Sequence, residues 1–163
     1  MDDVFGHWFA GFFTGEGHVR ITSSQTFYTC AAGITARLDD LPLLIEVQRE
    51  TLTGRIYQRR PVGRSHPCAE WIVTRKEEAQ TLVDIFNRYP LRGRKLADFL
   101  IWREAVQIWQ SMHPVRQPNG RFGGCDWTPI AVLKTTLLEG RQYRTPDLSQ
   151  LDHPQTAPTP VRA

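Results

Sequence analysis

Residues 9–17 read FAGFFTGEG, a stretch with three phenylalanines, three glycines and one carboxylate, Glu16. Gly11 and Gly15 stand four positions apart, so they lie on one face of a helix. A glycine within a helix costs about 1 kcal/mol relative to alanine, and a pair of them needs a physical reason. Two helices that present such faces to each other can approach until their backbones nearly touch. The spacing therefore predicts a helix-to-helix interface through Gly11 and Gly15.

Glu16 follows this glycine face directly, at the C-terminal end of the predicted contact. A symmetric partner helix would bring its own Glu16 close by, and two neighbouring carboxylates repel each other unless a positive charge lies between them. A hard divalent cation such as Mg²⁺, which takes oxygen ligands, is the natural occupant. The alternative is that Glu16 merely follows a core helix whose C-terminal cap is Gly15 or Gly17. An isolated pattern of this kind favours the alternative, so the neighbouring segments decide.

The segments around this stretch alternate between helical and strand patterns. Residues 4–15 are apolar on every side, which is typical of a buried helix. Apolar residues at helical spacing and period-two alternation predict the other elements, which are strands at 18–25, 29–37, 55–61 and 69–75 and helices at 41–52, 76–89, 95–109 and 128–141. Asp39 and Asp40 are expected to cap the helix at 41–52, and Gly54 to end it. Up to residue 109 the order is αββαββαα, an α+β fold with helices on one face of the sheet.

Length and composition describe one ordinary globular domain. The chain has 163 residues, of which 40% are hydrophobic and 23% charged, and no apolar run approaches the length of a membrane span. We expect one domain at 1–145 and a disordered proline-rich tail at 146–163. The N-terminus lacks the pattern of a secretory signal, which predicts a cytoplasmic or organellar protein that is not secreted. The three cysteines are widely spaced and are expected to be reduced, without a zinc site.

The basic residues are strongly biased toward arginine. Net charge is only +3, but among the 20 basic residues only Lys76, Lys95 and Lys134 are lysine. The planar guanidinium suits phosphate groups and guanine edges better than an ammonium does. This bias hints at nucleic acid, although a GC-rich genome would produce the same bias.

The stretch FAGFFTGEG resembles the LAGLIDADG motif of homing endonucleases. Ala10 and Gly11 stand at the second and third positions of that motif, and residues 15–17 stand at its end. The αββαββα order is similar to the core of the family over roughly residues 4–112, which implies a saddle-shaped antiparallel sheet followed by C-terminal helices. The motif occurs once here, and single-motif members of the family form homodimers. The resemblance thus implies a two-fold interface made by the motif helices, through Trp8, Gly11, Phe12 and Gly15.

The same resemblance implies an activity and its site residues. Members of the family cut double-stranded DNA at long, roughly palindromic sites with the help of Mg²⁺, and spread introns or inteins. Glu16 takes the place of the acidic metal ligand, assisted by the backbone carbonyl of Gly15. Lys95, within YPLRGRKLADF, matches the basic residue that follows the third helix, and Arg37 matches a polar position that orders water near the metal. No membrane or small-molecule partner is expected.

Strand parity predicts the surface that meets DNA. If Val19 and Ile21 face the helices, the residues between them face the other way. The side chains expected on this open face are His18, Arg20, Thr22 and Ser24 from the first strand, Arg55, Tyr57 and Arg59 from the third, and Glu70, Ile72 and Thr74 from the fourth. Such a face can enter the major groove, where arginine reads guanine. Arg60 and Arg64, in the loop between strands, are expected to bind phosphates.

Two other functions fit part of these patterns. An RNA maturase or a non-cleaving DNA-binding protein of LAGLIDADG type would keep the fold without the nuclease, and would need no Mg²⁺ to bind. A plain α+β interaction domain would use FAGFFTGEG only as a packed helix. That last alternative predicts a monomer.

Overall fold

The computed structural model describes residues 1–24, 27–59, 61, 66–116 and 122–141. Its elements, in chain order, are α1 (Asp3–Glu16), β1 (Gly17–Ser23), β2 (Tyr28–Arg37), the 3-10 turn η1 (Leu38–Asp40), α2 (Leu41–Thr51), β3 (Arg55–Arg59), β4 (Cys68–Val73), α3 (Lys76–Arg88), α4 (Gly93–Ser111), β5 (Val115–Arg116), β6 (Phe122–Gly123) and α5 (Thr128–Gly140). The predicted αββαββαα order and the late helix are confirmed. The short pair β5 and β6 was not predicted. The tail at 146–163 lies outside the described residues.

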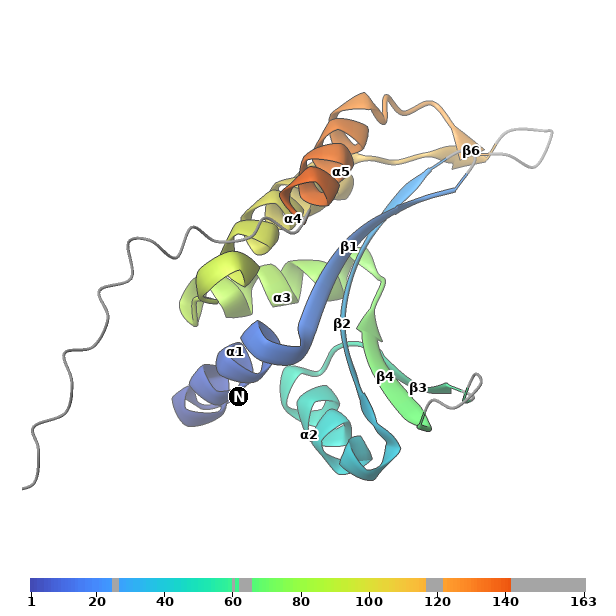
Figure 1. Cartoon of the computed structure of the whole chain (residues 1–163). Helices are drawn as coiled ribbons and strands as arrows, with labels where there is room; N and C mark the ends of the chain where they lie inside the picture. Colours follow the sequence, from blue (N-terminus) through green and yellow to red (C-terminus); the bar gives the residue numbers. More distant parts are fainter. Residues whose placement is uncertain (25–26, 60, 62–65, 117–121, 142–163) are drawn as a thin grey trace, which may run out of the picture.

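The main sheet has the order β1-β2-β4-β3, and all its pairs are antiparallel. Gly17 pairs with Ile34 and Ile21 with Cys30, while Thr35 pairs with Glu70 on β4. Figure 1 shows the strands curving together, with α1, α2, α3 and α4 on one side of them. This arrangement is the predicted α+β fold with a curved antiparallel sheet. No helix of the described residues covers the opposite face of the sheet (Figure 1).

Helix α1 is buried on one side only. Asp2 caps its first turn, because the carboxylate accepts a hydrogen bond of 2.8 Å from the amide of Phe5. Phe9 and Phe13 are fully buried against the sheet, whereas Val4 is 81% exposed and Trp8 39%. The expectation of a helix buried all round is therefore wrong for the single chain, since the sheet and the other helices cover only one of its faces.

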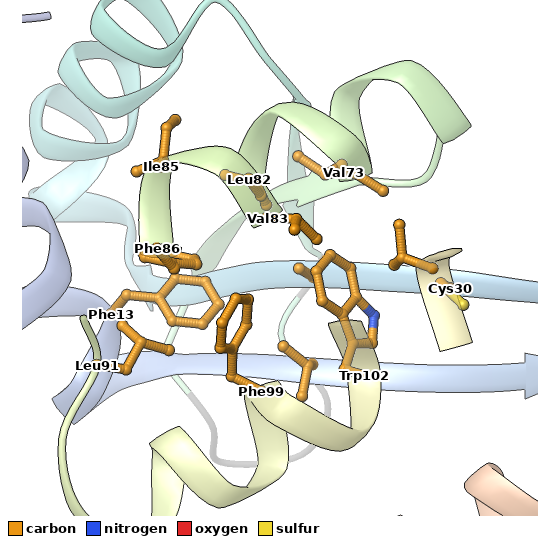
Figure 2. Close-up of a cluster of buried hydrophobic side chains, with 14 of the residues drawn as sticks. Phe13, Cys30, Val73, Leu82, Val83, Ile85, Phe86, Leu91, Phe99 and Trp102 are labelled. Carbon is orange, nitrogen blue, oxygen red and sulfur yellow. The ribbon is translucent and has the colours of Figure 1, made fainter. Parts of the chain in front are cut away.

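Aromatic side chains fill the core between the sheet and the helices (Figure 2). The ring of Phe86 lies 4.7 Å from that of Phe13 and 5.6 Å from that of Phe99, measured between centroids. These contacts join α1, α3 and α4. Burying a side chain of this size contributes about 1.5–3 kcal/mol, so the cluster anchors the helices on the sheet.

The two ends of α2 differ from the expectation. Asp40 occupies the N-cap position, but its side chain makes no capping hydrogen bond, and Asp39 pairs with Arg37 instead. At the other end Leu52, rather than a glycine, takes the left-handed conformation, with φ of 54°. Gly54 also has a positive φ, and its Cα faces the indole of Trp71 so closely that a Cβ would lie 2.4 Å from Nε1. The Trp71 indole N–H donates to the carbonyl of Thr53 at 2.8 Å, which fixes this turn against β4.

Within the described residues, no helix is long and apolar enough to cross a membrane.

Candidate functional site

The end of α1 places the Glu16 carboxylate in solvent. The chain passes from helix to strand at Gly17, which is buried, and a Cβ there would lie 2.4 Å from the ring of Phe13. Only glycine therefore allows β1 to begin this close to the helix. Glu16, one residue earlier, is exposed. The motif thus presents one carboxylate at the junction of α1 and the sheet.

Lys95, which the resemblance assigns to the site, lies next to this junction. Its ammonium group, in the first turn of α4, donates a hydrogen bond to the carbonyl of Gly17. Burial lowers the pKa of Lys95 below its ordinary value, while the nearby Asp98 carboxylate acts to raise it. The structure therefore brings Lys95 beside the residue that follows Glu16.

A basic hollow of about 530 Å³ surrounds Lys95. Its lining residues are Thr14, His18, Arg92, Gly93, Arg94, Lys95, Asp98 and Arg141. Four of these side chains are cationic lysine or arginine and one is a carboxylate. Such a surface attracts phosphate groups.

Arg141 was missed by sequence reasoning. It follows α5, donates to the carboxylate of Asp98 at 3.0 Å and to the carbonyl of Val19 at 2.7 Å, and so ties the C-terminal helix to α4 and β1. One feature of the sequence could have indicated that Asp98 needs a basic partner. Asp98 shares the helical face of Trp102 and Trp109, which are buried, so its carboxylate is expected to be buried as well. A buried carboxylate needs a positively charged or hydrogen-bonding partner.

Arg37 lies apart from this hollow. It ends β2, three residues beyond the Ile34 that pairs with Gly17, which is about 10 Å along a strand. Its guanidinium forms an ion pair of 2.9 Å with Asp39, and this hydrogen bond lowers the pKa of the Asp39 carboxyl. The water-ordering role that the resemblance implies for Arg37 stays a prediction.

The open face of the sheet collects the side chains predicted there. In the register, His18, Arg20 and Thr22 share one face of β1, and the pairs along β2 and β4 carry the same parity to β3. The predicted residues on this face are His18, Arg20, Thr22, Arg55, Tyr57, Arg59, Glu70 and Ile72, and Thr74 follows directly after β4. Ser24 lies beyond the end of β1, where its hydroxyl donates to the carbonyl of Phe27 at 3.3 Å. Arg60 and Arg64 lie outside the described residues.

Glu70 is the exception to the expected exposure. Its side chain is only 5% exposed, because Arg20 and Arg59 cover it from two sides. Glu70 therefore lies on the predicted face but is buried there, and the contact with DNA that was expected of it stays a prediction.

The predicted interface of α1 is open in the single chain. Among the residues that the structure describes, a Cβ atom built on Gly11 or Gly15 would meet no atom of another segment within 4 Å. Trp8 is partly exposed on the same side, and Phe12 is half-buried beside it, stacked on Trp8 at 5.3 Å between centroids. The helix thus carries an apolar face with a glycine-lined path along it. This is the surface that the sequence assigned to Trp8, Gly11, Phe12 and Gly15.

The oxygen ligands at Glu16 suit a hard cation that takes its remaining ligands from other molecules. Among the described residues, no three or more His, Cys, Asp or Glu side chains gather into a possible metal site. A closed site made by one chain is therefore absent there. One exposed carboxylate and the backbone carbonyl of Gly15 suit Mg²⁺, which commonly keeps waters and takes its remaining ligands from substrate phosphates.

Comparisons with known proteins agree with this geometry. The probable intron-encoded endonuclease 3 of Neurospora crassa is 29% identical over 109 residues, which are 62% of this chain and 20% of that protein. The chain thus spans about a fifth of the length of this curated relative.

Solved structures of homing endonucleases share the fold. The archaeal intron-encoded homing endonuclease I-Vdi141I, solved in complex with DNA, matches with a TM-score of 0.68 and 19% identity over 91% of this chain and 92% of that one. The I-LtrWI LAGLIDADG homing endonuclease, bound to its target DNA, matches with a TM-score of 0.63 and 20% identity, over 83% of this chain and 45% of that one. The sequence model of the LAGLIDADG endonuclease family matches residues 9–106, more than half of the chain. The chain therefore belongs to the LAGLIDADG endonuclease family.

Proposed function

We propose that the protein is a homing endonuclease that cuts double-stranded DNA as a homodimer and depends on a divalent metal ion. The observation that carries this proposal is the position of Glu16. Its carboxylate is exposed at the end of the open face of α1, beside the basic hollow around Lys95. A polar, arginine-bearing sheet face begins at the next residues of the chain.

Glu16 and the carbonyl of Gly15 hold Mg²⁺ in this proposal, together with oxygens from DNA. When bound, the ion supplies activation of a water molecule and stabilisation of charge on the phosphate that is cut. Lys95 is held by the carbonyl of Gly17 and directs positive charge toward the same junction. Arg92 and Arg94, which line the hollow, draw the DNA backbone into it. The water-ordering role of Arg37 rests on the resemblance to the family alone, because its guanidinium lies apart from the hollow and pairs with Asp39.

The homodimer follows from the open face of α1. Two copies that pack through Gly11 and Gly15 bring their two Glu16 carboxylates together, and each copy serves one DNA strand. Contact through Trp8 and Phe12 buries apolar surface that the single chain leaves in water. A double-strand break at a roughly palindromic site is the expected product.

The open sheet face supplies DNA recognition. Arg55, Tyr57 and Thr22 are exposed on it, which supports a role in contacting bases or backbone in the major groove. Arg20 and Arg59 lie on the same face. Because arginine prefers the O6 and N7 atoms of guanine, we expect guanines at several positions of the target site.

Cleavage of a randomised, roughly palindromic DNA library tests the proposal. The wild-type protein, Glu16→Gln and Glu104→Gln are each incubated with Mg²⁺ or with EDTA, and the ends of the products are sequenced. Glu104 is exposed on α4, so its variant removes the same charge away from the site. We expect Glu16→Gln to lower cleavage by roughly 100-fold or more while DNA binding remains, because a carboxylate ligand of the metal is lost. Cleavage should require Mg²⁺ and be unchanged in Glu104→Gln.

Other outcomes of this experiment are equally informative. Cleavage by Glu16→Gln at the wild-type rate would remove Glu16 from the active site. Selective retention of certain DNA sequences without cuts would instead indicate a non-cleaving DNA-binding protein, and RNA would be the next ligand to test for a maturase.

A further inference from the structure

One carboxylate on the open sheet face is buried by the groups that it binds. Glu70 of β4 accepts a hydrogen bond of 3.1 Å from Nη2 of Arg20 on one oxygen. Its other oxygen accepts from Nε of Arg59 at 3.0 Å and also from Nη2 of the same guanidinium. The imidazole of His18 lies 3.6 Å from the first oxygen. We call Glu70, Arg20 and Arg59 the arginine clamp.

The clamp connects side chains from β1, β3 and β4, and its contact between β1 and β4 spans β2. In the order β1-β2-β4-β3, Arg59 on β3 is a direct neighbour of Glu70, but Arg20 on β1 must reach across β2. The β2 residues opposite Arg20 and His18 are Ala31 and Gly33, which have almost no side chain on this face. A Cβ on Gly33 would lie 3.3 Å from the His18 ring and 2.6 Å from the carbonyl of Trp71. Small residues on β2 therefore open the path from β1 to Glu70.

The clamp leaves donors available on both arginines. Each guanidinium carries five N–H donors, of which Glu70 engages one on Arg20 and two on Arg59. Nε of Arg20 is buried, so the donors left for a ligand are those of the terminal Nη groups. The side chain of Arg20 is 37% exposed and that of Arg59 is 54% exposed, so both arginines reach the surface that Glu70 does not.

The electrostatics of the clamp favour a negative or electron-rich ligand. Burial, and the nearby Arg20 guanidinium, lower the pKa of His18 to about 4, so the imidazole is neutral at pH 7. Two guanidinium groups then face one carboxylate, which leaves an excess of one positive charge. Guanine presents two acceptors, O6 and N7, to such a group in the major groove.

We propose that Glu70 is a positioning residue for DNA sequence reading, which holds Arg20 and Arg59 in fixed orientations so that their remaining N–H groups meet guanine edges. The inference rests on the proposed function. It explains how the open face of the sheet would distinguish one DNA sequence from another. Glu70 does not touch DNA itself, because its oxygens are taken up by the two arginines. A held arginine loses less side-chain freedom on binding than a free one, so more of its hydrogen-bond energy becomes discrimination between bases.

Selection of bound duplexes from a randomised library tests this inference. All variants carry Glu16→Gln, which keeps the DNA uncut and makes the result independent of cleavage. The series is Glu70→Gln, Glu70→Asp, Arg20→Gln and Arg59→Gln, with Glu104→Gln as the control that removes one negative charge elsewhere. Base preferences are read position by position, and affinity for non-specific duplex is measured for each variant.

The Glu70 variant and the two arginine variants are expected to lose base preference at the same positions of the DNA site. Glu70→Gln should lose preference at the positions that Arg20→Gln and Arg59→Gln affect, with discrimination falling about 5- to 100-fold at each. Its non-specific affinity should match that of Glu104→Gln. A residue that only supports folding would weaken binding to all duplexes alike and leave this pattern unchanged.

Three results would overturn the inference. One is an unchanged base preference in Glu70→Gln, and another is a change confined to positions that neither arginine variant affects, which would indicate direct contact by Glu70. The third is a parent protein that selects no bases. If Glu70→Gln fails to fold by near-UV circular dichroism, Glu70→Asp carries the test, since it keeps the charge but is too short to reach both arginines. Selection without any Mg²⁺-dependent cleavage by the wild type would refute the nuclease and leave the clamp intact.

Discussion

The glycines of this chain differ in whether packing within the chain requires them. Gly17 and Gly33 are required by close packing inside the chain, because a Cβ at either position would lie less than 3 Å from a neighbouring atom. A Cβ on Gly11 or Gly15 would meet no atom of another described segment within 4 Å, so packing within the described part of the chain gives no reason for these two glycines. This contrast separates glycines that the packing of the chain requires from glycines that it does not require. It also supports the interface that the spacing of Gly11 and Gly15 predicts.

At the residue scale, Gly33→Ala should lower the free energy of unfolding by about 1–3 kcal/mol, the usual cost of forcing an extra group into a packed site. The added methyl group would press on the Trp71 carbonyl of β4 and on the His18 ring. Thr35→Ala, two residues further along β2 and exposed, is the matched control and should change stability much less. Urea unfolding measures both, and equal stability of the two variants would contradict the close packing at Gly33.

At the element scale, α1 serves two surfaces at once. Its inner face carries Phe9 and Phe13 into the aromatic core, and its outer face carries Trp8 and the glycine pair toward solvent. Open hollows flank the outer face, one beside Gly11 and Thr14 and one beside Val4 and Trp8. In the proposed dimer both faces of the helix have something to pack against, which would account for its apolar residues on every side.

Replacing Gly11 with leucine should therefore split the proposed dimer. The leucine side chain would fill the space that the backbone of the partner helix needs, while the fold of the single chain has room for it. Sedimentation velocity measures the change from dimer to monomer. Ala97→Leu, a similar enlargement at an exposed position of α4, should remain a dimer. An unchanged sedimentation coefficient for Gly11→Leu would rule out this interface.

At the scale of the whole molecule, α5 closes the chain back onto the candidate site. Arg141 binds Asp98 and the carbonyl of Val19, and Arg94 of α4 donates to the carbonyl of Gly140 at 2.7 Å. Lys134 reaches the hydroxyl of Ser23 at 2.7 Å, at the end of β1. The C-terminal helix lies beyond the region that the family model matches, yet it braces β1 and completes the hollow around Lys95.

Asp98→Asn should accordingly loosen α5 and lower the free energy of unfolding by about 1–3 kcal/mol, since a mostly buried charge-assisted hydrogen bond is lost. Hydrogen exchange should show faster exchange in α5 and in the first turn of α4. Asp84→Asn, an exposed carboxylate on α3, is the control and should leave exchange in α5 unchanged. Exchange in α5 that stays at the wild-type rate in Asp98→Asn would show that the helix is held by other contacts.

Local sequence patterns determined the helices and the four strands of the main sheet, the face of β1 to which His18 and Arg20 belong, and the end of α1 at which Glu16 stands. These follow from periods of 3.6 and 2, which any short stretch carries by itself. The tertiary structure alone decided that Arg20 reaches Glu70, 50 residues away, and that Arg141 reaches Asp98, 43 residues away. It also decided that one face of α1 stays open. Strand order, register and helix docking set these contacts. All three depend on how distant segments pack together, and the periodicity within one segment carries no information about that packing.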